Sequence, residues 1–207
     1  MKNKLWLVLI AVLVGFPVSS FALSNTTKFD ITATVPAATG INIVATQVNS
    51  ADNKFGAQVS KLDFNPLTFN SENSVWLPDH YFAIDVGTVN GSGTPAVSVS
   101  YGSEAVPTGQ AKGLGSKSTA TFVKITGATG SQTETALASH GPKKLLKALT
   151  TAENITSAEI AGGFLRVYVG IYPGGDSGIN AAGGEPFINS DKPGNYTGVL
   201  TLTATIP

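Results

Sequence analysis

The sequence predicts an all-β protein built as an antiparallel β-sandwich or barrel. Three observations support this fold class. The chain of 207 residues contains 23 glycines and 11 prolines, and only 13% of it is charged. Apolar and polar residues alternate with a period of two along several short segments, which is typical of half-buried strands. Segments rich in Gly, Pro and Asn separate these runs, as they do in sandwiches and barrels.

Charge and cysteine content exclude several classes of function. The 13 basic and 13 acidic residues balance, so electrostatics give no reason to expect nucleic acid or an anionic membrane surface as a partner. The chain has no cysteine, which excludes disulfides, thiolate metal sites and cysteine nucleophiles. The length predicts one domain or two small ones.

Residues 1–22 have the anatomy of a secretory signal peptide. Lys2 and Lys4 precede an apolar run of twelve residues, 5–16, and small residues stand at the expected positions before a cleavage site between Ala22 and Leu23. The alternative is a membrane anchor, but twelve helical residues span only ~18 Å of a ~30 Å hydrocarbon core. We therefore expect cleavage and export, which leave a mildly acidic mature chain.

The expected strands follow one another along the mature chain. The first, 29–35, alternates four apolar residues with Asp30, Thr32 and Thr34. The later ones are 41–48, a pair of runs at 62–64 and 67–69 interrupted by Pro66, 81–89, 96–101, 119–126, 164–172 and 196–206. The last run is the most regular, with Leu and Thr alternating almost to the end of the chain.

One segment predicts a helix. Residues 142–149 carry apolar side chains at helical spacing behind a proline in the first turn, with the lysines on a solvated face. Residues 173–193 predict a long loop, and the Gly113–Gly115 segment predicts a turn. We find no internal repeat and no domain linker.

The residues give no support for an enzyme. The tetrapeptide at 175–178, Gly-Asp-Ser-Gly, occurs in trypsin-like proteases, but a serine nucleophile needs a histidine base oriented by a carboxylate. Only His80 and His140 are available. His80 lacks the small-residue context usual around such a histidine, and Ile179-Asn180 stand where Gly-Pro is expected after the tetrapeptide. We expect no catalytic residue, no enzymatic activity and no cofactor.

Metal binding is equally unsupported by the sequence. Asp176, Glu185 and Asp191 lie in the long loop, but the alternating oxygen ligands of a calcium loop are absent. We expect them to be solvated carboxylates.

The two ends of the mature chain are the most informative parts of the sequence. An alternating apolar strand behind a polar leader, residues 23–28, would be a poor isolated element, since it has a face to bury and unpaired backbone on both edges. Insertion into the sheet of another subunit solves both problems, because main-chain hydrogen bonds bind the strand and alternate side chains fill pockets.

The same two ends resemble a known family. The segment 194–199, Gly-Asn-Tyr-Thr-Gly-Val, and the Leu/Thr alternation after it look like the closing strand of chaperone–usher pilins. With the segment 30–36, Asp-Ile-Thr-Ala-Thr-Val-Pro, the chain is most similar to the alpha-clade, or class 5, major pilins of colonisation-factor fimbriae. Those pilins also lack the disulfide found in other pilin clades.

The resemblance implies an incomplete immunoglobulin-like sandwich that is completed by a donor strand from a neighbouring subunit. It divides the chain into a signal peptide, 1–22, an N-terminal donor-strand extension, 23–36, and a pilin domain, 37–207. The implied donor residues are Phe29, Ile31, Ala33 and Val35. The implied acceptor groove and chaperone contacts are Tyr196, Gly198, Leu200, Leu202, Ala204 and Ile206, with Tyr196 and Gly198 shaping the start of the strand.

The resemblance also implies partners and a location. The partners are identical pilin subunits in a head-to-tail polymer, a periplasmic chaperone, an outer-membrane usher and a tip adhesin, with no nucleic acid. The subunit would be exported through the periplasm into an extracellular fimbrium on the cell surface, supporting adhesion to surfaces or host cells.

Two alternatives stay open. The chain can be a minor or tip adhesive subunit of the same pathway, or a monomeric secreted β-sandwich that binds a ligand. The second needs a platform of exposed aromatic rings. Trp76, Tyr81 and Phe82 around His80 form the one aromatic cluster in the sequence, and we expect packing roles for them.

Overall fold

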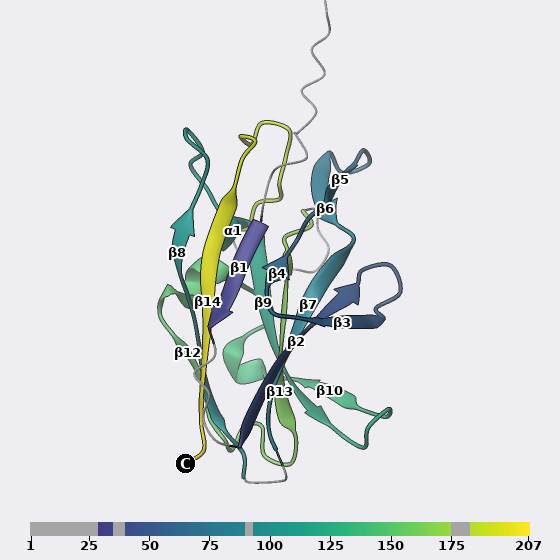
Figure 1. The fold of residues 1–207 in the computed structure, drawn as a ribbon, viewed down its shortest axis with the longest axis vertical. Coiled ribbons are helices and arrows are strands. Elements are labelled where there is room, and N and C mark those ends of the chain that lie inside the picture. The colour runs from purple at the N-terminus through teal and green to yellow at the C-terminus, as the bar shows by residue number, and fades with distance from the viewer. Residues whose placement is uncertain (1–28, 35–39, 90–92, 175–182) are drawn as a thin grey trace, which may run out of the picture.

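The computed structural model describes residues 29–34, 40–89, 93–174 and 183–207, and strands dominate this part of the chain (Figure 1). The strands are β1 (Phe29–Thr34), β2 (Ile41–Asn49), β3 (Phe55–Val59), β4 (Leu62–Asp63), β5 (Leu67–Asn70), β6 (Val75–Pro78), β7 (His80–Thr88), β8 (Ala96–Ala105), β9 (Ser118–Thr126), β10 (Thr133–Ala136), β11 (Lys144–Leu145), β12 (Glu153–Ile155), β13 (Phe164–Ile171) and β14 (Tyr196–Thr205). The helical elements are short: α1 (Leu114–Lys117) and the 3₁₀ turns η1 (Ala138–His140) and η2 (Leu146–Thr150).

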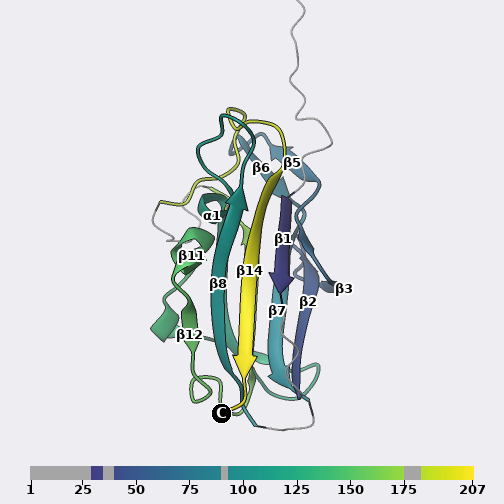
Figure 2. The same ribbon diagram turned by 60° about the vertical axis from the view of Figure 1, so that its left-hand side comes forward.

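The strands form two sheets that pack face to face. The five-stranded sheet has the order β12-β8-β14-β1-β4, and the seven-stranded sheet has the order β10-β9-β13-β7-β2-β3 with β11 beside β9. A separate hairpin consists of β5 and β6. Figures 1 and 2 show the two layers from two sides. The prediction of an all-β sandwich is therefore confirmed.

The core lies between the two sheets and follows from the alternation of side chains along each strand. Both sheets contribute to one continuous cluster of buried apolar residues. The five-stranded sheet supplies Val97, Val99, Tyr101, Leu200 and Leu202, and the seven-stranded sheet supplies Phe82, Ile84, Val86, Phe122, Val167 and Val169.

The long predicted strands are present, and several short strands were not predicted. The expected strands at 41–48, 81–89, 96–101, 119–126, 164–172 and 196–206 match β2, β7, β8, β9, β13 and β14 to within a few residues. The pair of runs around Pro66 does not form one strand: β4 joins the five-stranded sheet, whereas β5 pairs with β6 in the hairpin. β3, β6, β10 and β12 were not predicted.

The helix predicted for 142–149 is wrong. Lys144 and Leu145 pair with Ala120 and Thr119 of β9, and the chain then turns through η2. The apolar positions are buried as the spacing suggested, with Leu146 and Leu149 fully inaccessible. Backbone pairing with an open edge of β9 therefore replaces the first helical turn. The α-helical turn instead occupies α1, where the sequence predicted a turn.

The described part of the 173–193 loop packs onto the sandwich. Phe187 is buried and forms an isolated β-bridge with Trp76 of β6. Trp76 also donates from Nε1 to Asn189 Oδ1 at 2.8 Å. The loop therefore covers the end of the sandwich next to the β5–β6 hairpin. Within the described ranges, no helix has the length and hydropathy needed to span a bilayer.

Candidate strand-exchange groove

The first and last strands of the chain lie side by side in the five-stranded sheet (Figure 2). β1 pairs in parallel with β14, from Phe29 opposite Tyr196 to Thr34 opposite Thr201. Its other edge meets β4 in antiparallel pairing only at Asp30 and Ile31. Among the described strand pairs this is the one parallel pairing. β1 thus fills a slot between β14 and β4, and β14 supplies most of its backbone partners.

β14 builds the wall of this slot, and its side chains alternate strictly between core and surface. The core-facing residues are buried: Tyr196, Gly198, Leu200, Leu202 and Ala204. The residues between them face outward and are partly or fully exposed. On its other edge, β14 pairs antiparallel with β8. Because β1 ends at Thr34, opposite Thr201 of β14, residues 202–205 have β8 as their one strand partner within the described part of the chain.

Gly198 lies where the β14–β8 register shifts. Thr197 pairs with Ala105, but Val199 pairs with Gly102, so β8 carries one extra residue opposite this point. The ring of Tyr101 fills the space in front of Gly198: a Cβ there would lie 2.6 Å from Tyr101 Cε2 and Cζ. The Tyr101 hydroxyl donates to Glu104 Oε2 at 2.9 Å. A glycine is therefore needed here because a ring occupies the place of a side chain.

Tyr196 anchors the start of β14 in the core. Its ring packs edge-on against Phe187 with centroids 5.0 Å apart, and its hydroxyl donates to the Lys192 carbonyl at 2.7 Å. Burial, with a smaller contribution from Asp191, raises the pKa of the Tyr196 hydroxyl. The hydroxyl thus stays a donor, and the last loop is tied to the strand that follows it.

The other end of the wall is open. Ile206 lies beyond the end of β14 and is only partly buried. With Pro207, Gly93 and Ala158 it lines a surface hollow of about 400 Å³. A partner that binds along β14 would therefore find an accessible hollow next to its last residues.

The structure places most of the predicted site residues together. Phe29, Ile31 and Ala33 lie in β1, directly beside the predicted acceptor strand, in the same molecule. Val35 and the predicted cleavage residues Ala22 and Leu23 lie outside the described residues. The sequence did not identify two further parts of the groove. These are Tyr101, for which no local pattern was informative, and Leu62, whose alternation with Phe64 was a usable signal.

The two histidines have packing roles. His80 is buried, with Nδ1 2.6 Å from Asp79 Oδ1 and Nε2 2.7 Å from the Asp63 carbonyl. Its ring stacks edge-on against Phe82. Neither ring nitrogen is left to act as a base.

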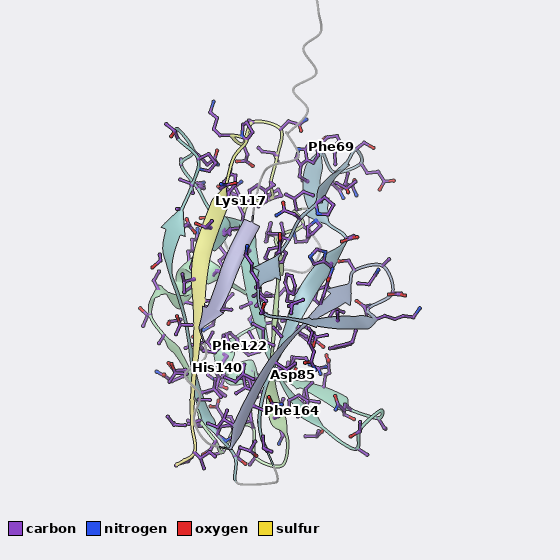
Figure 3. The ribbon with its side chains drawn as sticks, viewed as in Figure 1. Phe69, Asp85, Lys117, Phe122, His140 and Phe164 are labelled. Carbon is purple, nitrogen blue, oxygen red and sulfur yellow. The ribbon has the colours of Figure 1, made fainter. Side chains whose placement is uncertain are left out.

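His140 is enclosed by carboxylates and lies beside Phe122 (Figure 3). Its Nδ1 is 2.5 Å from Glu153 Oε1, and its Nε2 is 3.0 Å from Glu159 Oε1. These contacts join η1 to β12 and to the turn that follows it. Asp176 and Ser177, which belong to the protease-like tetrapeptide at 175–178, lie outside the described residues.

The carboxylates proposed as solvated loop residues differ from one another. Glu185 pairs at the surface with Lys112. Asp191 is not solvated: its side chain is 12% exposed and pairs with Lys117. Asp176 is not described. No group of three or more His, Asp or Glu side chains able to hold a metal ion occurs in the described ranges.

The aromatic cluster around His80 separates into different environments. Phe82 lies in the core, Trp76 packs on Phe69 in the β5–β6 hairpin, and Tyr81 faces outward against Tyr168. The three rings therefore form no common platform.

Comparisons of the chain with protein-family models, with curated proteins and with solved structures found no match. Its function has to be inferred from its sequence pattern and its geometry.

Proposed function

We propose that the chain is a structural subunit, a major pilin, of a fimbrium in which each subunit donates its N-terminal strand to the next one. The observation that supports this is the position of β1 in the slot between β14 and β4. The resemblance at both ends of the mature chain supports the same assignment.

β1 is suited to exchange because its pairing is unequal. It has backbone partners along its whole length on β14 but only at two residues on β4. A second copy of the same strand can form the same hydrogen bonds when it replaces the first, so the exchange resembles domain swapping. Relative to an empty slot, insertion of either copy gains ~0.5–1.5 kcal/mol for each main-chain bond and ~1.5–3 kcal/mol for each large side chain buried. The gross gain, on the order of 10 kcal/mol, is comparable to the free energy of unfolding of a whole domain.

Exchange of this kind produces a filament. The donated strand and the accepting slot are different surfaces, so the contact is head-to-tail and each added subunit leaves a new slot open. A subunit held in this way needs no disulfide, which fits the absence of cysteine. In this proposal a periplasmic chaperone covers the slot before exchange, an outer-membrane usher directs the exchange, and a tip adhesin ends the filament.

The first experiment tests whether the N-terminal strand makes the polymer. The chain is expressed with and without residues 23–36, and detergent-resistant polymers are measured by electrophoresis without heating and by electron microscopy. We expect the deletion to remove polymers, and a synthetic peptide of residues 23–36 to bind the deleted chain. Filaments formed by the deleted chain would overturn the proposal.

A matched pair of substitutions tests which face of the strand matters. Ile31→Asp introduces a charge on the apolar face expected from the sequence, and Thr32→Asp places the same charge on the polar face. We expect Ile31→Asp to abolish polymerisation and Thr32→Asp to retain it. Equal polymer from both variants contradicts insertion into a buried groove.

One observation favours a second candidate, a monomer that keeps its own strand, since β1 occupies the slot of its own chain. The cysteine-free chain allows a direct test, because Thr32 and Val199 are backbone partners. A Thr32→Cys/Val199→Cys variant should form an intramolecular disulfide that locks β1 in place. We expect the oxidised variant to stay monomeric and to polymerise once reduced. If the reduced variant and the unmodified chain also stay monomeric, the monomer is the functional form.

A further inference from the structure

The outward face of the seven-stranded sheet carries a groove of about 760 Å³. Aromatic rings from three strands line it: Phe55 of β3, Tyr81 of β7 and Tyr168 of β13. Tyr81 and Tyr168 pack edge-on with centroids 5.8 Å apart, and Phe55 is 48% exposed. The groove thus offers aromatic ring surface at an outward face of the protein.

A charged network holds one side of this groove in place. Arg166 of β13 donates from Nε and Nη2 to both carboxylate oxygens of Asp85, at 2.6 and 2.8 Å. Its guanidinium group lies over the Phe55 ring, 4.5 Å from the centroid. Figure 3 shows Asp85 near Phe164, whose ring also faces the guanidinium at 5.7 Å. An arginine whose planar guanidinium group donates two hydrogen bonds to one carboxylate has little freedom to move.

Glu134 of β10 joins the same network and also lines the groove. It accepts from the Tyr168 hydroxyl and from Arg166 Nη1. Burial and the hydrogen bond to Glu134 raise the pKa of Tyr168 to about 12, so its hydroxyl remains a donor. Because both donors reach the same oxygen, the negative charge of Glu134 is partly neutralised within the protein.

Lys143 also lines the groove. In the described part of the chain its ammonium group has no hydrogen bond and no ion pair. Burial lowers its pKa. A partly buried cation is costly unless an anion accompanies it. The neighbouring Lys144, in contrast, pairs with Glu153 at 2.6 Å. Lys143 therefore provides a positive group that can meet an anion from outside.

We infer that this groove binds a saccharide unit that carries a carboxylate. The aromatic rings can pack on the apolar face of a sugar ring, and the ammonium group of Lys143 can bind the carboxylate. Small polar residues on the walls can bond the sugar hydroxyls: Ser50, Asn53, Thr119 and Thr121. The volume is within the range of ~300–1,000 Å³ usual for small-ligand sites.

This binding site is separate from strand exchange. The groove lies on the outward face of the seven-stranded sheet, whereas β1 lies in the five-stranded sheet. A subunit can therefore bind a sugar whether or not it polymerises, and a failure of one proposal leaves the other intact.

The test uses two probes that differ in one group, methyl glucuronide and methyl glucoside. Binding to the purified chain is measured by saturation-transfer NMR and by titration calorimetry. We expect the glucuronide to bind about tenfold more tightly, since a hydrogen bond to a charged group contributes more than one between neutral groups. Lys143→Gln should remove this preference, and Phe55→Ala should weaken both probes.

Two controls define the outcomes. Lys54→Gln makes the same charge change next to Phe55, at a side chain that is 82% exposed and outside the groove, and it should retain the preference. Thermal unfolding shows whether Lys143→Gln is folded, as we expect from the removal of a partly buried cation. Equal binding of both probes, or acetate binding as tightly as the glucuronide, would overturn the proposal.

Discussion

Lys117 and Asp191 form an ion pair inside the protein, with Nζ and Oδ2 2.8 Å apart. The Lys117 side chain, at the end of α1, is only 2% exposed, and the Asp191 side chain is 12% exposed. Lys117 also donates to the Pro186 carbonyl at 3.0 Å and lies over the Phe187 ring. The pair thus joins the one α-helical turn of the described chain to the loop that leads into β14. Figure 3 shows Lys117 in the upper half of the view.

We expect Asp191→Asn to be strongly destabilising, by about 3–5 kcal/mol, because it leaves a buried ammonium group without its counter-ion. Urea unfolding measures the effect. Glu185→Gln is the matched control, since it breaks an ion pair of the same loop with Lys112 whose side chains are 49% and 43% exposed. That change should cost at most ~1 kcal/mol. Equal losses in the two variants would show that burial of the Lys117 pair is energetically unimportant.

Gly198→Ala should destabilise the sandwich by roughly 1–3 kcal/mol, because the new methyl group meets the Tyr101 ring and forces β14 or the ring to move. The midpoint of thermal unfolding measures this. Gly102→Ala, on the neighbouring strand β8, is the control: no atom lies within 4 Å of its Cβ position, so we expect a neutral or slightly stabilising effect. A neutral Gly198→Ala would mean that the tight contact is not required.

The stability of the protein should fall in acid partly through Glu159. Hydrogen bonds from the Ser139 hydroxyl and the Thr156 backbone N–H lower the pKa of Glu159 to about 2 from 4.5. Because the folded pKa lies below the unfolded one, this stabilisation is complete above about pH 4.5 and is lost as the pH falls toward about 2. Glu159→Gln should therefore flatten the decrease in unfolding free energy over this pH range.

Ser139→Ala tests the cause of that shift, since it removes the donor with the largest effect on the pKa while keeping the carboxylate. We expect a smaller flattening than in Glu159→Gln, measured by urea unfolding at a series of pH values. A pH profile identical to that of the unchanged protein in both variants would contradict the assignment.

Leu202→Ala should cost about 2–5 kcal/mol, because the side chain is fully buried in the core and its removal leaves a cavity. Thr203→Ala, one residue further along β14, changes an exposed side chain and should cost less than ~0.5 kcal/mol. Urea unfolding of the two variants separates them. Similar losses would contradict the alternation of β14 between core and surface.

The sequence could predict the long strands because alternation is a local property. β14 could be predicted from the alternation of Leu200 and Leu202 with threonines, and from Leu200 onward the apolar residues are buried while the threonines face outward. The short strands lack this information. β3 is mostly exposed, and it is a strand because β2 offers an edge to pair with. In the segment 142–149 the same leucines satisfy a helix or a strand with a 3₁₀ turn, and only the presence of β9 decides between them.

The site was predicted in the same uneven way. Both β1 and β14, which form the strand-exchange slot, could be predicted from local pattern. Tyr101, however, comes from β8 and meets Gly198 only through the fold. The aromatic groove on the outward face of the seven-stranded sheet was not predicted for the same reason. Phe55, Tyr81 and Tyr168 are far apart in the sequence, and register alone brings them to one face.

The parallel pairing of β1 with β14 also determines how the molecule responds to mechanical load. The N-terminal end of β1 lies beside Tyr196, and β14 continues from there to its last residue at the opposite end of the sheet. A pull on the two ends of the chain therefore drags the strands in opposite directions along their own length. This geometry shears the ladder, so all of its hydrogen bonds carry the load together, whereas a hairpin opened from one end breaks them one by one. A strand held in this orientation resists stretching as a unit.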